Sequence, residues 1–391
     1  MPSFYMAYMA RIRPAAAIVA LAMVLAACGA PAQHSDETDI RLLTRQSLER
    51  AEEYFVVTAF RDKGLFRYSY DPVKDSYTSR NNELRQLMGA RLLAELAAGD
   101  PALLAKHRTN LGFLLEHWYR EEGGHGYIFY DNKSKLGANA MALRTLVYSP
   151  DYPEHRHQAE MLAKGVLALQ NPDGSLRPWL IEPDYEFDPD YLMTFYSGEA
   201  ILALVEYAEK SGDAAVLESA RRAQDFYLDR YVVHIKDNYY PAYVPWHTQS
   251  LSRLYRLTGE LRYAEAILTL NDELLKIQDT TEHVGRFHDP DKPEFGSPHA
   301  SSDAVYTEGL AYAVEIARDL GDEQRAGRYL RALEAGLRHL SSLQYTESNT
   351  GGRAQRARML GGLRVSESNP NIRIDSVQHA IDAFIKALKV L

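Results

Sequence analysis

The sequence predicts an all-α protein, a single (α/α)6 toroid in which six helical hairpins form an inner and an outer ring of helices. Apolar residues recur at helical spacing almost throughout residues 39–391, and strand alternation is scarce. Short and long connections alternate, and together they define a repeat of roughly 55–60 residues. An open solenoid of tetratricopeptide type is the alternative, but those repeats are shorter and lack long aromatic loops.

The periodicity predicts twelve helices joined in pairs by tight turns. Each tight turn contains a glycine followed by an acid, as in Gly212-Asp213 and Gly259-Glu260. Glycine suits a helix C-cap, and the acid suits the first turn of the next helix, where its charge meets the helix dipole. We expect helices over residues 41–60, 80–97, 101–120, 136–148, 153–170, 192–211, 213–230, 244–258, 260–276, 302–319, 321–343 and 374–390.

The two rings differ in composition. Helices after tight turns, such as 321–343, carry charged faces and are expected in the solvated outer ring. Helices after long loops contain small residues, such as Gly198 and Gly309, that let neighbouring inner helices approach closely. In a closed ring the inner helices all begin at one end, so the polar and aromatic residues at their six starts should line one mouth of the barrel.

The N-terminal residues indicate export. Arg11 and Arg13 precede an apolar stretch, residues 15–27, that is short for a membrane span. It ends in Leu25-Ala26-Ala27-Cys28, which resembles the lipobox of bacterial lipoproteins. This resemblance implies that residues 1–27 are a signal peptide and that lipid on Cys28 anchors the protein, on the periplasmic face of the outer membrane if the cell has one. An ordinary signal peptide with a chance cysteine is the alternative.

The composition predicts a tether and excludes some classes of partner. Residues 28–38 are small and polar, which predicts a tether before the toroid domain at 39–391. The formal net charge is -9 without a basic cluster, so nucleic acid is not an expected partner. Cys28 is the only cysteine, so once it carries lipid the chain has no disulfide and no cysteine ligand for a metal.

Candidate site residues fall at or near the starts of the inner helices. Glu199 and Glu308 lie inside helices beside glycine and apolar residues, where a carboxylate needs a wet lumen or a partner. Plainer explanations exist for other residues, because Asp375 could be an N-cap or pair with Arg373, and His379 could be a core histidine. The catalytic candidates are Glu199, Asp303, Glu308, Asp190 and Asp375. The substrate-binding candidates are Asn82, Arg85, Tyr196, Tyr243, Trp246, His247, Gln249, His299, Tyr306, Arg373 and His379.

In this arrangement the chain resembles the six-hairpin glycosidase-like superfamily, mainly in architecture. Residues 246–259 are similar to a helix in the C-terminal domain of glucuronyl C5-epimerases, with Ser250 where glycine is usual. Residues 81–86 and 196–204 are similar to motifs in uncharacterised bacterial toroid proteins. The resemblance implies that the protein binds or processes a glycan, without fixing the reaction.

Three functions fit these residues. Hydrolysis of a glycosidic bond is the leading expectation, because paired carboxyl groups could act as acid and as base or nucleophile. An epimerase or lyase on a uronic-acid polymer is the second, since a histidine or tyrosine base with a nearby arginine or asparagine suits proton abstraction beside a carboxylate. A non-catalytic glycan-binding or scaffold lipoprotein, with a protein partner in envelope assembly, is the third.

We expect neither a metal nor a cofactor. No His-Glu-x-x-His pattern occurs. A zinc site built from His247, His299 and His379 is the alternative, because the three come from successive inner helices. Zinc cyclases with a related toroid, however, use cysteine ligands.

Overall fold

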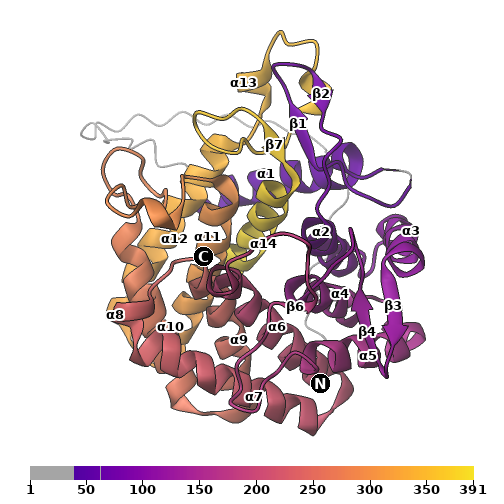
Figure 1. Cartoon of the computed structure of the whole chain (residues 1–391). Helices are drawn as coiled ribbons and strands as arrows, with labels where there is room; N and C mark the ends of the chain where they lie inside the picture. The colour runs from indigo at the N-terminus through magenta and orange to yellow at the C-terminus, as the bar shows by residue number, and fades with distance from the viewer. Residues whose placement is uncertain (1–38, 62) are drawn as a thin grey trace, which may run out of the picture.

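The computed structural model describes residues 39–61 and 63–391 and shows two concentric rings of helices (Figure 1). The predicted signal peptide, Cys28 and the tether lie outside the described residues. Within the described ranges, no helix is long and apolar enough to cross a membrane. The inner ring consists of α2 (Glu83–Leu96), α4 (Leu136–Tyr148), α6 (Pro189–Ser211), α9 (Tyr243–Thr258), α11 (Ala300–Asp319) and α14 (Ile374–Val390). The outer ring consists of α1 (Ile40–Glu53), α3 (Pro101–His117), α5 (Arg156–Leu167), α7 (Ala214–Leu228), α10 (Leu261–Leu274) and α12 (Glu323–Leu343).

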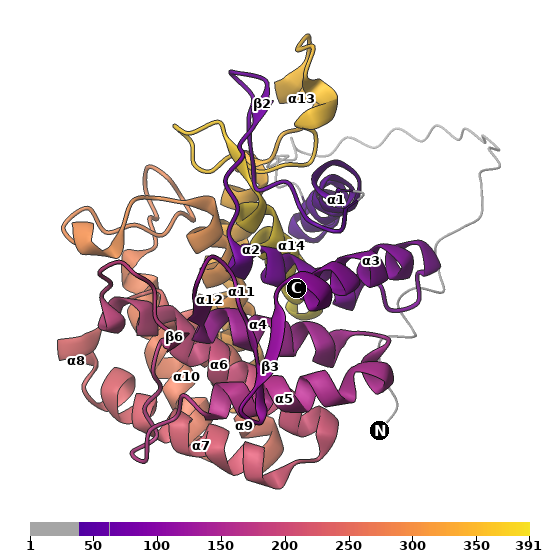
Figure 2. The same cartoon turned by 45° about the vertical axis from the view of Figure 1, so that its right-hand side comes forward.

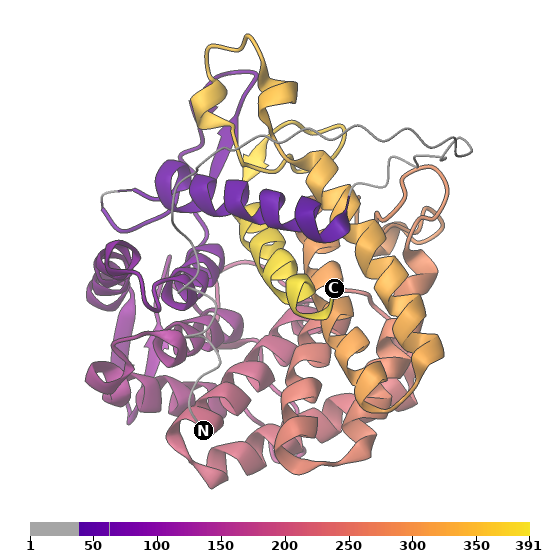
Figure 3. The same ribbon diagram turned by 180° about the vertical axis from the view of Figure 1, so that it is seen from behind.

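The inner ring is closed. Each inner helix contacts the next one along the chain, and α14 returns to contact α2. Five outer helices pack against the inner helix that precedes them, whereas α1, the first helix, packs against α14, the last (Figure 3). The sixth hairpin is therefore assembled from the two ends of the described chain, and the predicted (α/α)6 toroid is confirmed.

Cap chemistry explains where the hairpins turn. Gly212 ends α6 in the left-handed conformation with φ of 78°, which glycine adopts without steric cost. Asp213 then caps α7, because its side chain accepts hydrogen bonds from the backbone N–H groups of Ala215 and Val216. Asp100 caps α3 in the same way after the turn that contains Gly99.

Short strands and short helices lie within the long connections between the ring helices. The strand β7 (Ile372–Arg373) pairs antiparallel with β1 (Ser69–Asp71), so that Ser69 lies opposite Arg373 and the start of α14 is tied to the N-terminal part of the ring. In Figure 2 the hairpin of β1 with β2 (Ser76–Tyr77) and the short helix α13 (Glu347–Thr350) project from the ring together. The strands are β1 (Ser69–Asp71), β2 (Ser76–Tyr77), β3 (Tyr119–Glu122), β4 (His125–Ile128), β5 (Ser134–Lys135), β6 (Trp179–Ile181) and β7 (Ile372–Arg373). The short helices include η3 (Tyr54–Ala59), η4 (Tyr152–His155), η5 (Asp229–Val233), α8 (Ile235–Asn238), η6 (Leu275–Ile277), η7 (Pro293–Phe295), α13 (Glu347–Thr350) and η8 (Arg356–Arg358).

The interior of the ring holds matched charges as well as apolar side chains. Arg144 of α4 donates to Glu206 of α6 at 2.7 Å, and both are buried. Arg91 of α2 donates to both carboxylate oxygens of Asp382 on α14. Because a buried charge requires a partner, these pairs account for ionised residues in the centre of the barrel.

Candidate active site

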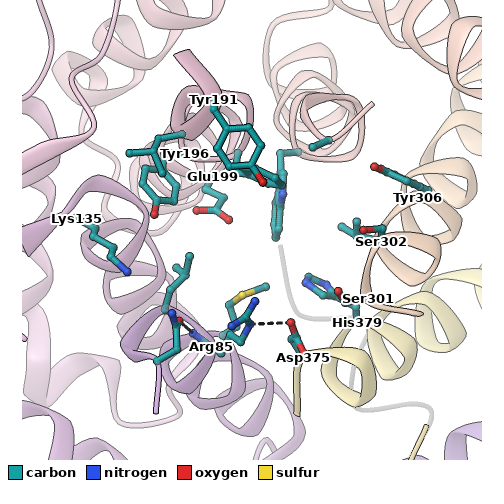
Figure 4. A pocket seen from close by; sticks show the side chains of 18 residues that line it. Arg85, Lys135, Tyr191, Tyr196, Glu199, Ser301, Ser302, Tyr306, Asp375 and His379 are labelled. Atoms are coloured by element: carbon teal, nitrogen blue, oxygen red, sulfur yellow. Dashed lines mark hydrogen bonds and ion pairs between the residues drawn. The ribbon is translucent and has the colours of Figure 1, made fainter. Parts of the chain in front are cut away.

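A cavity of about 290 Å³ opens at the end of the barrel where the inner helices begin (Figure 4). All six inner helices, or the residues just before them, contribute to its wall, as a closed ring requires. It is lined by Asn82, Leu84, Arg85, Met88, Lys135, Tyr191, Leu192, Phe195, Tyr196, Glu199, Ala242, Trp246, Ser301, Ser302, Val305, Tyr306, Asp375 and His379.

Glu199 is a carboxyl group without a charge partner on this wall. The residue is 2% exposed, and its Oε2 atom has no hydrogen-bond partner among the described residues. Burial raises its pKa to about 8, although the Arg144 and Lys135 cations act in the opposite direction. Glu199 is therefore mainly protonated at neutral pH and can donate a proton. Figure 4 shows its carboxyl group facing the cavity.

Asp375, across the cavity, has the opposite character. Its Oδ2 atom accepts hydrogen bonds from Arg85 Nε at 2.7 Å and Arg373 Nη2 at 2.7 Å. Its Oδ1 atom accepts from Arg373 Nε at 2.6 Å and the Ser376 backbone N–H at 3.1 Å. Burial opposes ionisation, but the two guanidinium groups outweigh it and hold the pKa of Asp375 well below its usual range. Asp375 is an ionised carboxylate whose oxygens are already engaged.

His379 contributes a neutral imidazole to the same cavity. Burial lowers its pKa to about 4, with the Asp382 and Asp375 carboxylates opposing the shift. Its Nδ1 atom is buried without a hydrogen-bond partner among the described residues. Its ring packs edge-on against Trp246, with centroids 5.9 Å apart. An unprotonated imidazole of this kind can accept a proton at neutral pH.

Aromatic side chains and a second cation complete the wall. Tyr191, Tyr196, Trp246 and Tyr306 line the cavity, and such rings suit the apolar faces of sugars. Lys135 forms an ion pair with Glu83 at 2.9 Å. Lys135 and Tyr191 were missing from the sequence-based candidates. Tyr191 stands at a helix start, which could have identified it, but nothing in the spacing of Lys135 indicates that it reaches the cavity.

Several candidates face elsewhere and are held by other partners. Asp190 has a side chain that is 77% exposed and pairs with Arg230 at 2.9 Å. Asp303 accepts hydrogen bonds from the Phe287 backbone N–H at 2.9 Å and from His339 at 3.2 Å. Neither residue lines the cavity. The prediction that Asp190 and Asp303 lie at the mouth of the barrel with the other catalytic candidates is therefore wrong.

The other candidates that do not line the cavity lie on a different side of their helix or have other partners. His247 follows Trp246 and points about 100° away from it around the helix. It accordingly hydrogen-bonds Ser197 at 3.0 Å within a buried cluster that includes Tyr243. His299 caps α11 through the Ser301 backbone N–H. Gln249 is buried, Glu308 lies beside His379 without lining the cavity, and Arg373 reaches the site only through Asp375.

One cluster in the described residues has the makeup of a metal site. Glu308, His379 and Asp382 each offer a ligand atom, and these atoms lie within 4.8 Å of one another. This is the only such group found there, so His247, His299 and His379 do not come together as the alternative zinc site requires. Arg91 already donates to both Asp382 oxygens, and the charge of Lys386 also acts on Glu308. Cationic side chains of the protein therefore already lie close to both carboxyl groups of this cluster.

Comparison with known proteins places the fold but not the reaction. No family model and no curated protein matches the sequence. Among solved structures, a D-mannose isomerase superposes with a TM-score of 0.70 at 11% identity, covering 91% of this chain and 100% of that one. An unsaturated glucuronyl hydrolase specific for heparin gives 0.62 at 11% identity, covering 90% and 97%. An α-1,6-mannanase from Salegentibacter sp. gives 0.62 at 10% identity, covering 90% and 100%. At these identities the likeness is one of fold alone.

Proposed function

We propose that this protein is a carbohydrate-active enzyme that transfers protons on a sugar held in the cavity, with His379 as the base and Glu199 as the acid. The observation that carries the proposal is that one cavity combines a neutral imidazole with a protonated carboxyl group. Pairs of titratable groups whose surroundings hold them in opposite roles are typical of acid–base catalysis. The aromatic wall supports a sugar as the substrate, and known enzymes of this fold include sugar isomerases and glycan hydrolases.

In this reaction His379 removes a proton from the carbon beside a carbonyl or carboxylate group. The carbon–hydrogen electron pair moves into the new carbon–carbon double bond, and negative charge develops on the oxygen. Arg85 can balance that charge, because it uses Nε for Asp375 and Nη1 for Tyr68, whereas no described residue accepts from its Nη2. Glu199 returns a proton to the sugar, which gives an isomer or epimer, or protonates a leaving oxygen, which gives an elimination product. A uronic-acid polymer is one substrate that offers such a carbon.

Glycosidic hydrolysis is a second candidate. Glu199 has the protonated state that a general acid needs, and Asp375 has the ionised state that a base or nucleophile needs. The geometry favours it less, because Asp375 accepts hydrogen bonds from two arginines and a backbone N–H. A carboxylate bound in this way is a weakened base.

Deuterium incorporation separates the two reactions. The protein is incubated in deuterium oxide with free hexoses, disaccharides and uronic-acid polymers. Isomerisation or epimerisation predicts a new isomer with deuterium on a sugar carbon, and elimination predicts a product with a new carbon–carbon double bond. Hydrolysis predicts new reducing ends with neither carbon-bound deuterium nor a new double bond. Glu199→Gln and His379→Asn should each reduce exchange at least 100-fold. Asp190→Asn, a carboxyl-to-amide change on the exposed surface, is the matched control and should retain full activity. Binding of a glycan without turnover would instead support the scaffold function.

We also propose that the enzyme is lipid-anchored through Cys28, on the strength of the sequence alone. Cys28→Ala should give an unlipidated or uncleaved product, and partitioning of the variant into the detergent phase of a Triton X-114 extract tests this. Unchanged partitioning of this variant would rule out lipidation at Cys28.

A further inference from the structure

The contact between α4 and α6 leaves no room for a side chain at Gly137. A Cβ atom there would lie 2.5 Å from Glu199 Oε2 and 2.7 and 2.9 Å from two ring carbons of Tyr196. Contacts below 3.0 Å essentially never occur around a real Cβ. Gly137 is not among the glycines with positive φ, so the backbone does not require glycine there. The requirement comes from the acid and the ring that occupy this space.

Packing rather than hydrogen bonding determines where the Oε2 atom of Glu199 lies. No described residue hydrogen-bonds this atom. The charged groups that act on it are Arg144 within α4 and Lys135 just before it, and Glu83 at the start of α2 pairs with Lys135. On the α9 side, α6 packs through Gly198 against Trp246, which carries no charge.

We propose that Gly137 is the positioning residue for the acid: its missing side chain leaves the slot that holds the Oε2 atom of Glu199 away from water. This proposal rests on the proposed function, in which Glu199 is the acid. A methyl group at position 137 would displace this oxygen towards the cavity, where water can solvate the ionised carboxylate. The acid would then be misplaced against the substrate and mainly deprotonated at neutral pH.

Gly137→Ala tests this, and Gly112→Ala is the matched control. Gly112 lies in α3, where an added Cβ meets nothing within 4 Å. The proton affinity of Glu199 is read from its ¹³C-carboxyl NMR signal, which is assigned by its loss in Glu199→Gln. We expect the titration midpoint of Gly137→Ala to fall by at least one pH unit, a tenfold loss in proton affinity, while Gly112→Ala titrates like wild type. An unchanged midpoint in Gly137→Ala would overturn the proposal.

A double-mutant cycle keeps the test decisive if Gly137→Ala is unstable or unfolded. Aspartate is one methylene shorter than glutamate, so Glu199→Asp should raise the melting temperature of Gly137→Ala, or restore its folding, while giving no such gain in wild type. Additive effects would show that the two residues do not share this slot and would refute the proposal. Neither readout uses turnover, so retained activity in Glu199→Gln would disprove the catalytic role of Glu199 without affecting these two measurements.

Discussion

Replacing Glu199 with glutamine should stabilise the protein, by an amount that increases with pH. The side chain ionises near its ordinary value of 4.5 in the unfolded chain and only near about 8 in the folded protein. Because the pKa of Glu199 is raised in the folded state, its contribution to the free energy of unfolding is fully present below pH 4.5. That contribution is lost as the pH rises through 8. The loss amounts to about 3 kcal/mol at pH 7 and about 5 kcal/mol above pH 8. Glutamine has nearly the same shape and does not ionise, so it avoids this loss.

The measurement is urea denaturation of wild type and Glu199→Gln at pH 5, 7 and 8.5. Burial also raises the pKa of Glu308, with the Asp382 carboxylate acting in the same direction, so both proteins should lose stability through Glu308 as pH rises. The difference between them isolates Glu199, and it should grow by about 3 kcal/mol or more across this range. Asp190→Asn, the surface control, should show no such trend. Parallel stability curves for wild type and Glu199→Gln would refute the assignment of a buried, protonated carboxyl group.

Two further substitutions distinguish structural carboxylates from the acid. Asp375→Asn should destabilise the fold by about 2–3 kcal/mol in thermal melting, less than for a fully buried pair because the side chains of Arg85 and Arg373 are 28% and 25% exposed. Its pKa is lowered in the folded state, so its contribution in wild type is present above about pH 3.8 and should be lost as acid titration proceeds below that value. Asp303→Asn should cost about 1–3 kcal/mol through its bonds to Phe287 and His339, yet leave turnover per folded molecule unchanged because Asp303 does not line the cavity.

Apolar periodicity was sufficient to predict the fold, and cap chemistry and a π-helical segment account for errors at helix ends. The helix predicted over 136–148 has those bounds in the structure. The helix expected to begin at residue 192 begins at Pro189 instead, because Asp188 accepts from a backbone N–H and proline fits the first turn. The helix expected over 41–60 is α-helical only to Glu53 and continues as a π-helix, a change that apolar spacing does not encode.

The site was less predictable, because chain position gives the end of the barrel but not the direction of each side chain. Trp246 and His247 are adjacent in sequence, yet one lines the cavity and the other is buried behind it. The pair of Lys135 with Glu83 joins residues that are 52 positions apart, and no local pattern indicates it. Glu199 was identifiable because an unpaired carboxyl group within an apolar helix needs an explanation that only a lumen or a partner supplies.

The protonated state of Glu199 depends on how the ion pairs within the ring are distributed. Arg144 favours ionisation of Glu199, but its Nε and Nη2 donate to Glu206 at 2.7 and 3.2 Å. Were Arg144 unmatched, its charge would act more strongly on Glu199. Glu206→Gln should therefore lower the pKa of Glu199, and Arg144→Met should raise it, each followed by the ¹³C-carboxyl titration. Opposite shifts from the two ends of one ion pair are not expected from general loosening of the fold, and shifts in the same direction would contradict this account.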